Sequence, residues 1–243
     1  MINVIMSLQR RMIMKTITLT ENDLTKYFDH TFLKPFATSA DMEKLCAEAK
    51  QLNTAMVAIN PVHVELCKEL LLGSDVHVGA AIGFPLGQNT IETKVFETND
   101  AIEKGADEID YVINIGKAKE HDWEYLKAEM EAIVAACKQG KVISKVIFEN
   151  CYLEKDEIKT LAGIAKLVGP DYIKTSTGFG SNGATVEDVT LMKENCGEAV
   201  KVKAAGGIRD WETCKAMINA GASRIGTSSS IKILEEFKAA KGA

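Results

Sequence analysis

The sequence contains no apolar run that approaches the ~18 residues needed for a membrane-spanning helix. It also contains no excess of basic residues: 29 lysines and arginines stand against 34 aspartates and glutamates, which gives a formal net charge of −5. A mildly acidic chain without a dense basic cluster binds nucleic acid poorly, because it lacks the cations that neutralise phosphates. We therefore expect neither a membrane nor a nucleic acid as a partner.

Motifs for metals and redox chemistry are also missing. The six cysteines form no CxxC pair and the four histidines form no HxH or HxxxH pair, so the sequence predicts neither a zinc site nor a redox dithiol. No dinucleotide or P-loop site is expected. A chain of 243 residues buries its own core without disulfides, so we interpret the cysteines as reduced thiols of a cytoplasmic protein.

The first 19 residues differ from the rest of the chain. They contain four methionines and three basic residues but no acidic residue. Their charges follow the apolar residues, whereas those of a secretory signal precede them. We interpret residues 1–19 as a flexible N-terminal extension or as the result of a start codon upstream of Met12 or Met14. Thr20 followed by Asp23 predicts the start of the first helix.

From residue 27 onward, short runs rich in valine and isoleucine alternate with helical patterns. The predicted strands cover residues 27–32, 54–60, 76–84, 108–114, 141–149, 171–175, 199–205 and 223–227. The predicted helices cover about 41–52, 61–72, 91–104, 121–138, 155–168, 185–195, 210–220 and 230–240, with Gly140 and Gly169 as C-caps. Eight β/α units predict a single (β/α)8 TIM barrel over residues 20–243 with an extra N-terminal helix; an open doubly wound sheet is the alternative.

The loops after the last two strands predict a phosphate site. In a TIM barrel these loops often bind phosphate at the C-terminal ends of the strands. Gly206, Gly207 and Arg209 follow the seventh strand, and Gly226, Ser228 and Ser229 follow the eighth. Glycines let backbone N–H groups approach an oxyanion, helix N-termini add positive charge and serines add donors. The alternative is ordinary turn chemistry.

Two lysines lie at the ends of neighbouring strands, Lys174 in the sixth and Lys203 in the seventh. Strand interiors seldom carry lysine, because burying an ammonium group costs free energy. A second cation and desolvation both lower the pKa of a lysine from its usual ~10.4, so the neutral amine can attack a carbonyl and form a Schiff base. The alternative is that both lysines only supply positive charge to a phosphate.

Asp110 is the candidate acid and base. Strand alternation places Asp110 and Asn114 on one face and Ile109 and Tyr111 on the other, so we expect the two polar side chains to point into the barrel. An inward carboxylate beside a lysine can relay protons, although it can also serve as a structural ion pair. In the fifth strand the same alternation groups Lys145 with Glu149, which we expect to support the site.

These residues lie in a series of motifs that resembles the deoxyribose-phosphate aldolases, class I aldolases of TIM-barrel fold. The motifs are YFDHTFLKPFAT, AINPVHV, IGFPLGQNT, GADEIDYVINIG, KVIFEN, YIKTSTGF, VKAAGGIRD and GASRIGTSS, in this order between about Leu24 and Phe237. The resemblance implies cleavage of 2-deoxy-D-ribose 5-phosphate to D-glyceraldehyde 3-phosphate and acetaldehyde, without metal or organic cofactor. It also implies a cytoplasmic homodimer or homotetramer.

The resemblance also assigns roles. It implies that Lys174 forms the Schiff base, that Lys203 lowers the pKa of Lys174, and that Asp110 is the acid and base; we add Thr177 as a holder of water. The implied phosphate ligands are Gly178, Gly206, Gly207, Gly226, Ser228 and Ser229.

The chain departs from the family pattern at four positions: Phe32, Ala58, Asn150 and Phe179. Many relatives have cysteine at Ala58, threonine at Asn150 and leucine at Phe32. Some have lysine at Phe179, so the phosphate here is expected to depend on backbone donors and Arg209. Two other functions stay open, an isomerase acting on a phosphosugar and a sugar-phosphate sensor without catalysis.

Overall fold

Eight parallel strands close into a barrel in the computed structural model, which describes residues 19–242. The strands are β1 (Phe28–Thr31), β2 (Met56–Ile59), β3 (His77–Ile82), β4 (Glu108–Val112), β5 (Ile143–Ile147), β6 (Tyr172–Lys174), β7 (Lys201–Ala205) and β8 (Ala222–Thr227). Each strand pairs with the next, and β8 pairs with β1. This last pairing confirms the predicted (β/α)8 barrel, and the open-sheet alternative is wrong.

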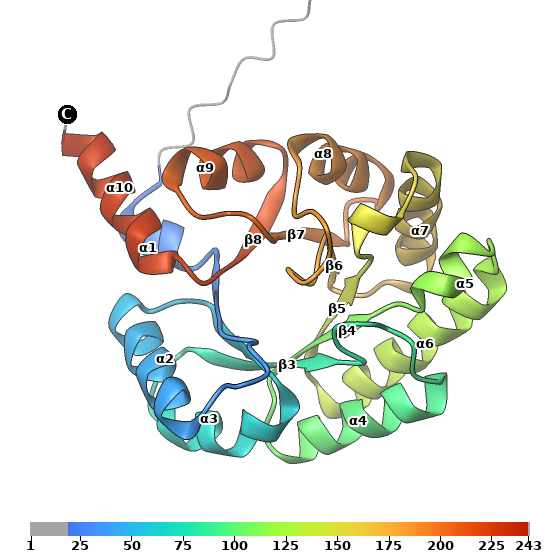
Figure 1. Ribbon diagram of the computed structural model, residues 1–243, viewed down its shortest axis with the longest axis horizontal. Helices are drawn as coiled ribbons and strands as arrows, with labels where there is room; N and C mark the ends of the chain where they lie inside the picture. The colour runs from blue at the N-terminus through green and yellow to red at the C-terminus, as the bar shows by residue number, and fades with distance from the viewer. Residues whose placement is uncertain (1–18, 243) are drawn as a thin grey trace, which may run out of the picture.

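The helices form a ring around the barrel (Figure 1). They are α1 (Glu21–Thr25), α2 (Ser39–Leu52), α3 (Val64–Leu70), α4 (Ile91–Glu103), α5 (Ile115–Lys119), α6 (Trp123–Gly140), α7 (Lys155–Val168), α8 (Val186–Asn195), α9 (Trp211–Asn219) and α10 (Ser230–Gly242), with 3-10 turns at Pro61–His63 and Asn150–Tyr152. The extra N-terminal helix is α1, which lies beside α10. Within residues 19–242, no helix is long and apolar enough to cross a membrane.

The start of α1 and its contact with α10 show where the packed part of the chain begins. Thr20 and Asp23 form a capping box at the predicted start of α1. Leu19 is buried, and its carbonyl accepts a hydrogen bond from Lys241 on α10. The packed part of the chain therefore includes Leu19, which the prediction had placed in the extension. The rest of the predicted extension, residues 1–18, lies outside the described residues.

Three local predictions need correction. Gly140 was expected to cap α6, but it is the last residue of that helix, and the left-handed C-cap of α6 is Lys141, with φ of 57°. Gly169 caps α7 as predicted, with φ of 75°. The short helix α5 was not predicted. Asn114 does not join Asp110 in the barrel, because its Oδ1 accepts a hydrogen bond from the Lys117 amide at 3.1 Å and caps α5.

Strand register brings the predicted catalytic residues together. Asp110 on β4 pairs in register with Lys145 on β5, and Lys174 on β6 pairs with Lys203 on β7. Tyr111 faces the helix layer, where the Lys94 amine of α4 lies 5.9 Å from its ring centroid. Asp110, one residue earlier on the strand, therefore faces the barrel interior, as the alternation predicted.

A buried ion pair between α4 and α6 holds the end of β4. The Lys94 amine lies 2.6 Å from Glu129 and donates to the Val112 carbonyl at 2.7 Å. The Asn114 amide donates to the other Glu129 oxygen at 3.0 Å. Both charged side chains are fully buried, so each depends on the other for compensation. The pair fixes the strand end just after Asp110.

Candidate active site

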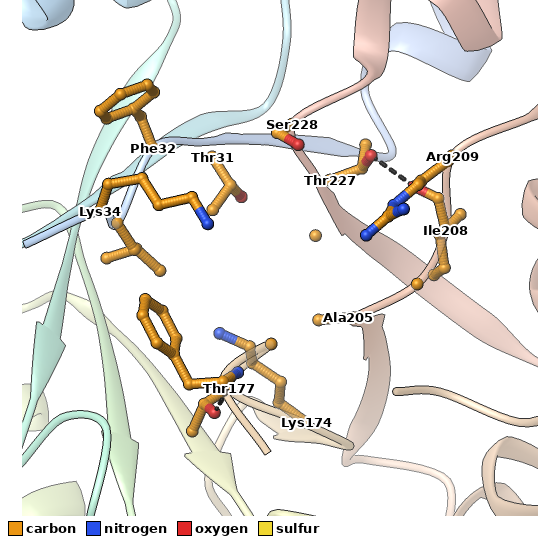
Figure 2. A pocket seen from close by; sticks show the side chains of 16 residues that line it. Thr31, Phe32, Lys34, Lys174, Thr177, Ala205, Ile208, Arg209, Thr227 and Ser228 are labelled. Carbon is orange, nitrogen blue, oxygen red and sulfur yellow. Dashed lines mark hydrogen bonds between the residues drawn. The ribbon is translucent and has the colours of Figure 1, made fainter. Parts of the chain in front are cut away.

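A cavity of about 310 Å³ opens at the C-terminal ends of β1, β6, β7 and β8 (Figure 2). It is lined by Thr31, Phe32, Leu33, Lys34, Lys174, Thr177, Gly178, Phe179, Ala205, Gly206, Gly207, Ile208, Arg209, Gly226, Thr227 and Ser228. The lining contains three cations and no acidic side chain. In the described part of the chain, no three histidine, cysteine or acidic residues are arranged to hold a metal ion.

The predicted lysines and aspartate meet below this cavity. The Lys174 amine donates to Asp110 Oδ2 at 2.9 Å, and the Lys203 amine donates to the same oxygen at 2.6 Å. The Lys145 amine donates to Asp110 Oδ1 at 2.6 Å. All four side chains are buried, and of the four only Lys174 lines the cavity. A carbonyl compound in the cavity can therefore reach Lys174 but not Lys203.

This surrounding shifts the pKa of Lys174. Burial and the neighbouring Lys203 ammonium lower the pKa of the Lys174 amine, Asp110 raises it, and the net result is a pKa of about 8. Burial alone raises the pKa of Asp110, but the ammonium groups of Lys145, Lys174 and Lys203 hold it well below its usual value. Near neutral pH the site thus combines an ionised carboxylate with a lysine that is partly uncharged.

A layer of ion pairs lies beneath the lysines. Lys203 also pairs with Asp29, and Lys145 also pairs with Glu108. Arg224 bridges the two acids, with its guanidinium 3.0 Å from Glu108 Oε2. Asp29, Glu108 and Arg224 were not predicted as site residues. Glu108 could have been found, because it stands two residues before Asp110 and so shares its face of β4.

Glu149 acts on the cavity through Thr177. Its carboxylate accepts hydrogen bonds from the Thr177 hydroxyl and, at 3.1 Å, from the Thr177 amide. Burial raises the pKa of Glu149, and these hydrogen bonds oppose the rise. The Thr177 oxygen in turn accepts from the Phe179 amide at 3.0 Å. Because its hydrogen is used on Glu149, Thr177 can bind a water only as an acceptor.

Most predicted phosphate ligands lie on the cavity wall. Gly178, Gly206, Gly207, Arg209, Gly226 and Ser228 all line it. Ser229 does not; its amide donates to the Thr227 oxygen at 2.9 Å. Thr227 donates to the Ile208 carbonyl at 2.7 Å, which ties the two loops together (Figure 2).

Glycine is needed at two of these positions. Gly206 has φ of 84°, and a Cβ there would lie 2.9 Å from the Gly183 Cα. A Cβ at Gly226 would lie 2.9 Å from Ala205 Cβ and 3.3 Å from Lys203 Cε. A side chain at Gly226 would therefore press on the lysine network.

The loop after β6 contains glycines at positions 178, 180 and 183, the spacing GxGxxG. In dinucleotide-binding proteins this motif opens directly into a helix. Here the loop continues to Thr185 before α8 begins at Val186. The motif therefore lacks the context of a dinucleotide site, and of its three glycines Gly178 lines the cavity.

The departures from the family pattern lie at different distances from the cavity. Phe32 and Phe179 line it, and the Phe179 ring meets Phe84 edge-on at 5.5 Å. Ala58 is buried on β2 outside the lining, and Asn150 is buried beside Met192. Thr31, Leu33 and Lys34 also line the cavity, from the end of β1 and the loop that follows it, and were not predicted.

A (β/α)8 barrel with a desolvated lysine at the floor of a positively charged cavity has the design of an aldolase for anionic carbonyl compounds. Residues 24–235 match the model of the DeoC/LacD family aldolases, and the chain belongs to this family. The resemblance found in the sequence is thereby confirmed.

Individual relatives agree with this assignment. A deoxyribose-phosphate aldolase of Lactobacillus acidophilus is 59% identical over 219 residues, which cover 90% of this chain and 92% of the relative. One of Bacteroides thetaiotaomicron is 56% identical over 223 residues, covering 92% and 94%. The solved structure of a deoxyribose phosphate aldolase from Aeropyrum pernix is described as a unique tetrameric structure. It has a TM-score of 0.85 at 32% identity, and the match covers 91% of this chain and 93% of that chain.

Proposed function

We propose that the chain cleaves 2-deoxy-D-ribose 5-phosphate reversibly to D-glyceraldehyde 3-phosphate and acetaldehyde through a Schiff base at Lys174. The observation that carries the proposal is the sharing of one Asp110 oxygen by the Lys174 and Lys203 amines beneath an open cavity. The names of the relatives at 59% and 56% identity support the choice of substrate.

The first steps form the covalent adduct. The neutral Lys174 amine attacks the C1 aldehyde of the open-chain sugar phosphate, and the carbinolamine loses water to give an iminium ion. Asp110 accepts hydrogen bonds from both lysines and so stands where protons must move between the nitrogen and the departing hydroxyl. A water that donates to Thr177 completes this relay.

The next steps break the C2–C3 bond and release the two aldehydes. The C3 hydroxyl gives its proton to the relay, the electrons of the C2–C3 bond move toward the iminium, and C3 leaves as the aldehyde of glyceraldehyde 3-phosphate. The remaining enamine takes a proton at C2. Water then hydrolyses the iminium, which frees acetaldehyde and restores the Lys174 amine.

The far end of the substrate carries the phosphate. We assign it to the loop after β7, the end of β8 and the loop after β8, where Gly206, Gly207, Gly226 and Ser228 line the cavity with Arg209. Gly178, after β6, lies on the same wall. Backbone amides at such loops bind oxyanions, and the start of α10 at Ser230 adds the positive end of a helix dipole.

Borohydride trapping tests the proposal. Incubation with deoxyribose 5-phosphate and borohydride should inactivate the enzyme and leave a reduced adduct on the peptide that contains Lys174, with no adduct in a Lys174→Met control. An adduct on another lysine would reject the assigned nucleophile. Release of neither aldehyde from deoxyribose 5-phosphate would reject the aldolase function and favour an isomerase or a sensor.

Assembly and compartment belong to the same proposal. The tetrameric structure from Aeropyrum pernix supports a homodimer or homotetramer for this chain. All six cysteines of the chain are free thiols, which supports a reducing, cytoplasmic compartment. Light scattering coupled to size-exclusion chromatography measures the assembly, and a monomer of 26.5 kDa would contradict it.

A further inference from the structure

Two cations on the cavity wall have no acidic partner. Lys34 and Arg209 both line the cavity and are exposed. Among residues 19–242, no carboxylate lies within 4.0 Å of either side chain, whereas Lys174 is held by Asp110. A cation that is neither buried nor paired contributes little to folding stability. Their charge is therefore free to meet a ligand.

The two cations face each other. Figure 2 shows the Lys34 amine and the Arg209 guanidinium pointing into the cavity from opposite sides, with Ser228 at the edge between them and Lys174 at the other edge. Lys34 comes from the loop after β1, and Arg209 comes from the loop after β7. A small anion that enters the cavity from solvent would lie between these two positive charges, on the side where Ser228 lines the wall.

Local contacts hold Lys34 in this position. The Lys34 carbonyl accepts a hydrogen bond from the Ala37 amide at 3.1 Å, and the Leu33 carbonyl accepts one from the Asn60 side chain at 3.4 Å. The Lys34 amine lies 5.9 Å from the Phe179 ring centroid. A cation–π contact of this kind orients the amine without neutralising its charge. Phe179 itself supplies no charge to a phosphate.

We propose that Lys34 is a substrate-binding residue whose ammonium pairs with the substrate phosphate opposite Arg209 and sets the preference for phosphorylated over unphosphorylated sugar. This inference rests on the proposed function, since it assigns the phosphate of that substrate. A charge-assisted hydrogen bond to a phosphate strengthens binding and leaves the chemistry at C1 to Lys174.

Steady-state cleavage of deoxyribose 5-phosphate and of deoxyribose by a Lys34→Met variant tests the inference. We expect KM for the phosphorylated sugar to rise at least ~10-fold, on the scale of one lost hydrogen bond between charged groups, with kcat little changed. The value of kcat/KM for deoxyribose should not change. Lys34→Arg should restore the preference, and Lys159→Met, an exposed lysine on α7, should leave it unchanged.

The preference for the phosphorylated sugar decides the inference. If Lys34→Met keeps the wild-type preference for deoxyribose 5-phosphate over deoxyribose, the inference is wrong. It is also wrong if the variant loses the same fraction of kcat/KM with both sugars. If the wild-type enzyme cleaves neither sugar, the proposed function fails, and calorimetric titration with inorganic phosphate decides the role of Lys34. Weaker phosphate binding by Lys34→Met then supports the assignment. Equal binding, or no binding by the wild type, refutes it.

Discussion

Replacement of Lys203 by leucine tests the link between the two lysines. In the wild type, burial and Lys203 together lower the pKa of Lys174 to about 8, against the pull of Asp110. Without Lys203, burial and Lys145 still lower the pKa of Lys174, but Asp110 raises it with less opposition. The pKa of Lys174 then moves back toward its ordinary value of 10.5.

The size of the effect follows from the neutral fraction. At pH 7 an amine with a pKa of about 8 is neutral in roughly one molecule in ten, and one with a pKa of 10.5 in roughly one in 3,000. The change in the pKa of Lys174 can therefore account for at most a ~300-fold loss of rate at pH 7. We expect turnover to fall by at least ~100-fold at pH 7. The loss should shrink steadily as the pH rises toward about 10.

The assay is the initial rate of aldehyde release across this pH range. Lys201→Leu is the matched control, because Lys201 is on the same strand as Lys203 but is exposed. Circular dichroism and urea unfolding check whether the variant is folded. Near-normal turnover at pH 7 would refute the role of Lys203, and a loss that stays constant with pH would refute its action through the pKa of Lys174.

Three further predictions concern the surrounding structure. Lys94→Met leaves Glu129 buried without its partner, so urea unfolding should show a loss of about 3–5 kcal/mol in the free energy of unfolding, and an unchanged midpoint would contradict this. Thr177→Val removes the hydroxyl that Glu149 and the Phe179 amide share, so kcat should fall about 10-fold or more and Thr177→Ser should retain it; equal rates for both variants would contradict the role. Gly226→Ala brings a methyl group against Lys203 Cε, and a displaced Lys203 would lower the pKa of Lys174 less. The acid limb of the kcat/KM profile should therefore move to higher pH, and an unmoved limb would contradict this.

The eight-unit barrel was predictable because its signal is repeated. Each strand is a short apolar run followed by a helical pattern. The pairing of β8 with β1 confirmed that the eight predicted units close into a barrel. The helix α5 was missed for the opposite reason. It has five residues, Ile115–Lys119, too few to show a helical period, and its start depends on the Asn114 cap.

The cluster of Lys174, Lys203 and Asp110 was predictable because strand ends rarely carry buried charges without a function. Their compensating partners were harder to predict. Arg224 reaches Asp29 across 195 residues of sequence, a contact that exists only once the barrel has closed. Lys34 lies in a loop, where no alternation predicts the direction of a side chain, so its entry into the cavity required the structure.

The most direct test of the account is the pH dependence of Schiff-base formation at Lys174. Trapping of the substrate adduct with a mild borohydride at a series of pH values, followed by peptide mass mapping, gives the rate at this one amine. The account predicts a rate that rises with pH to half its maximum near pH 8, since only the neutral amine reacts. A half-maximum near pH 10.5, the value of an ordinary lysine, would contradict it.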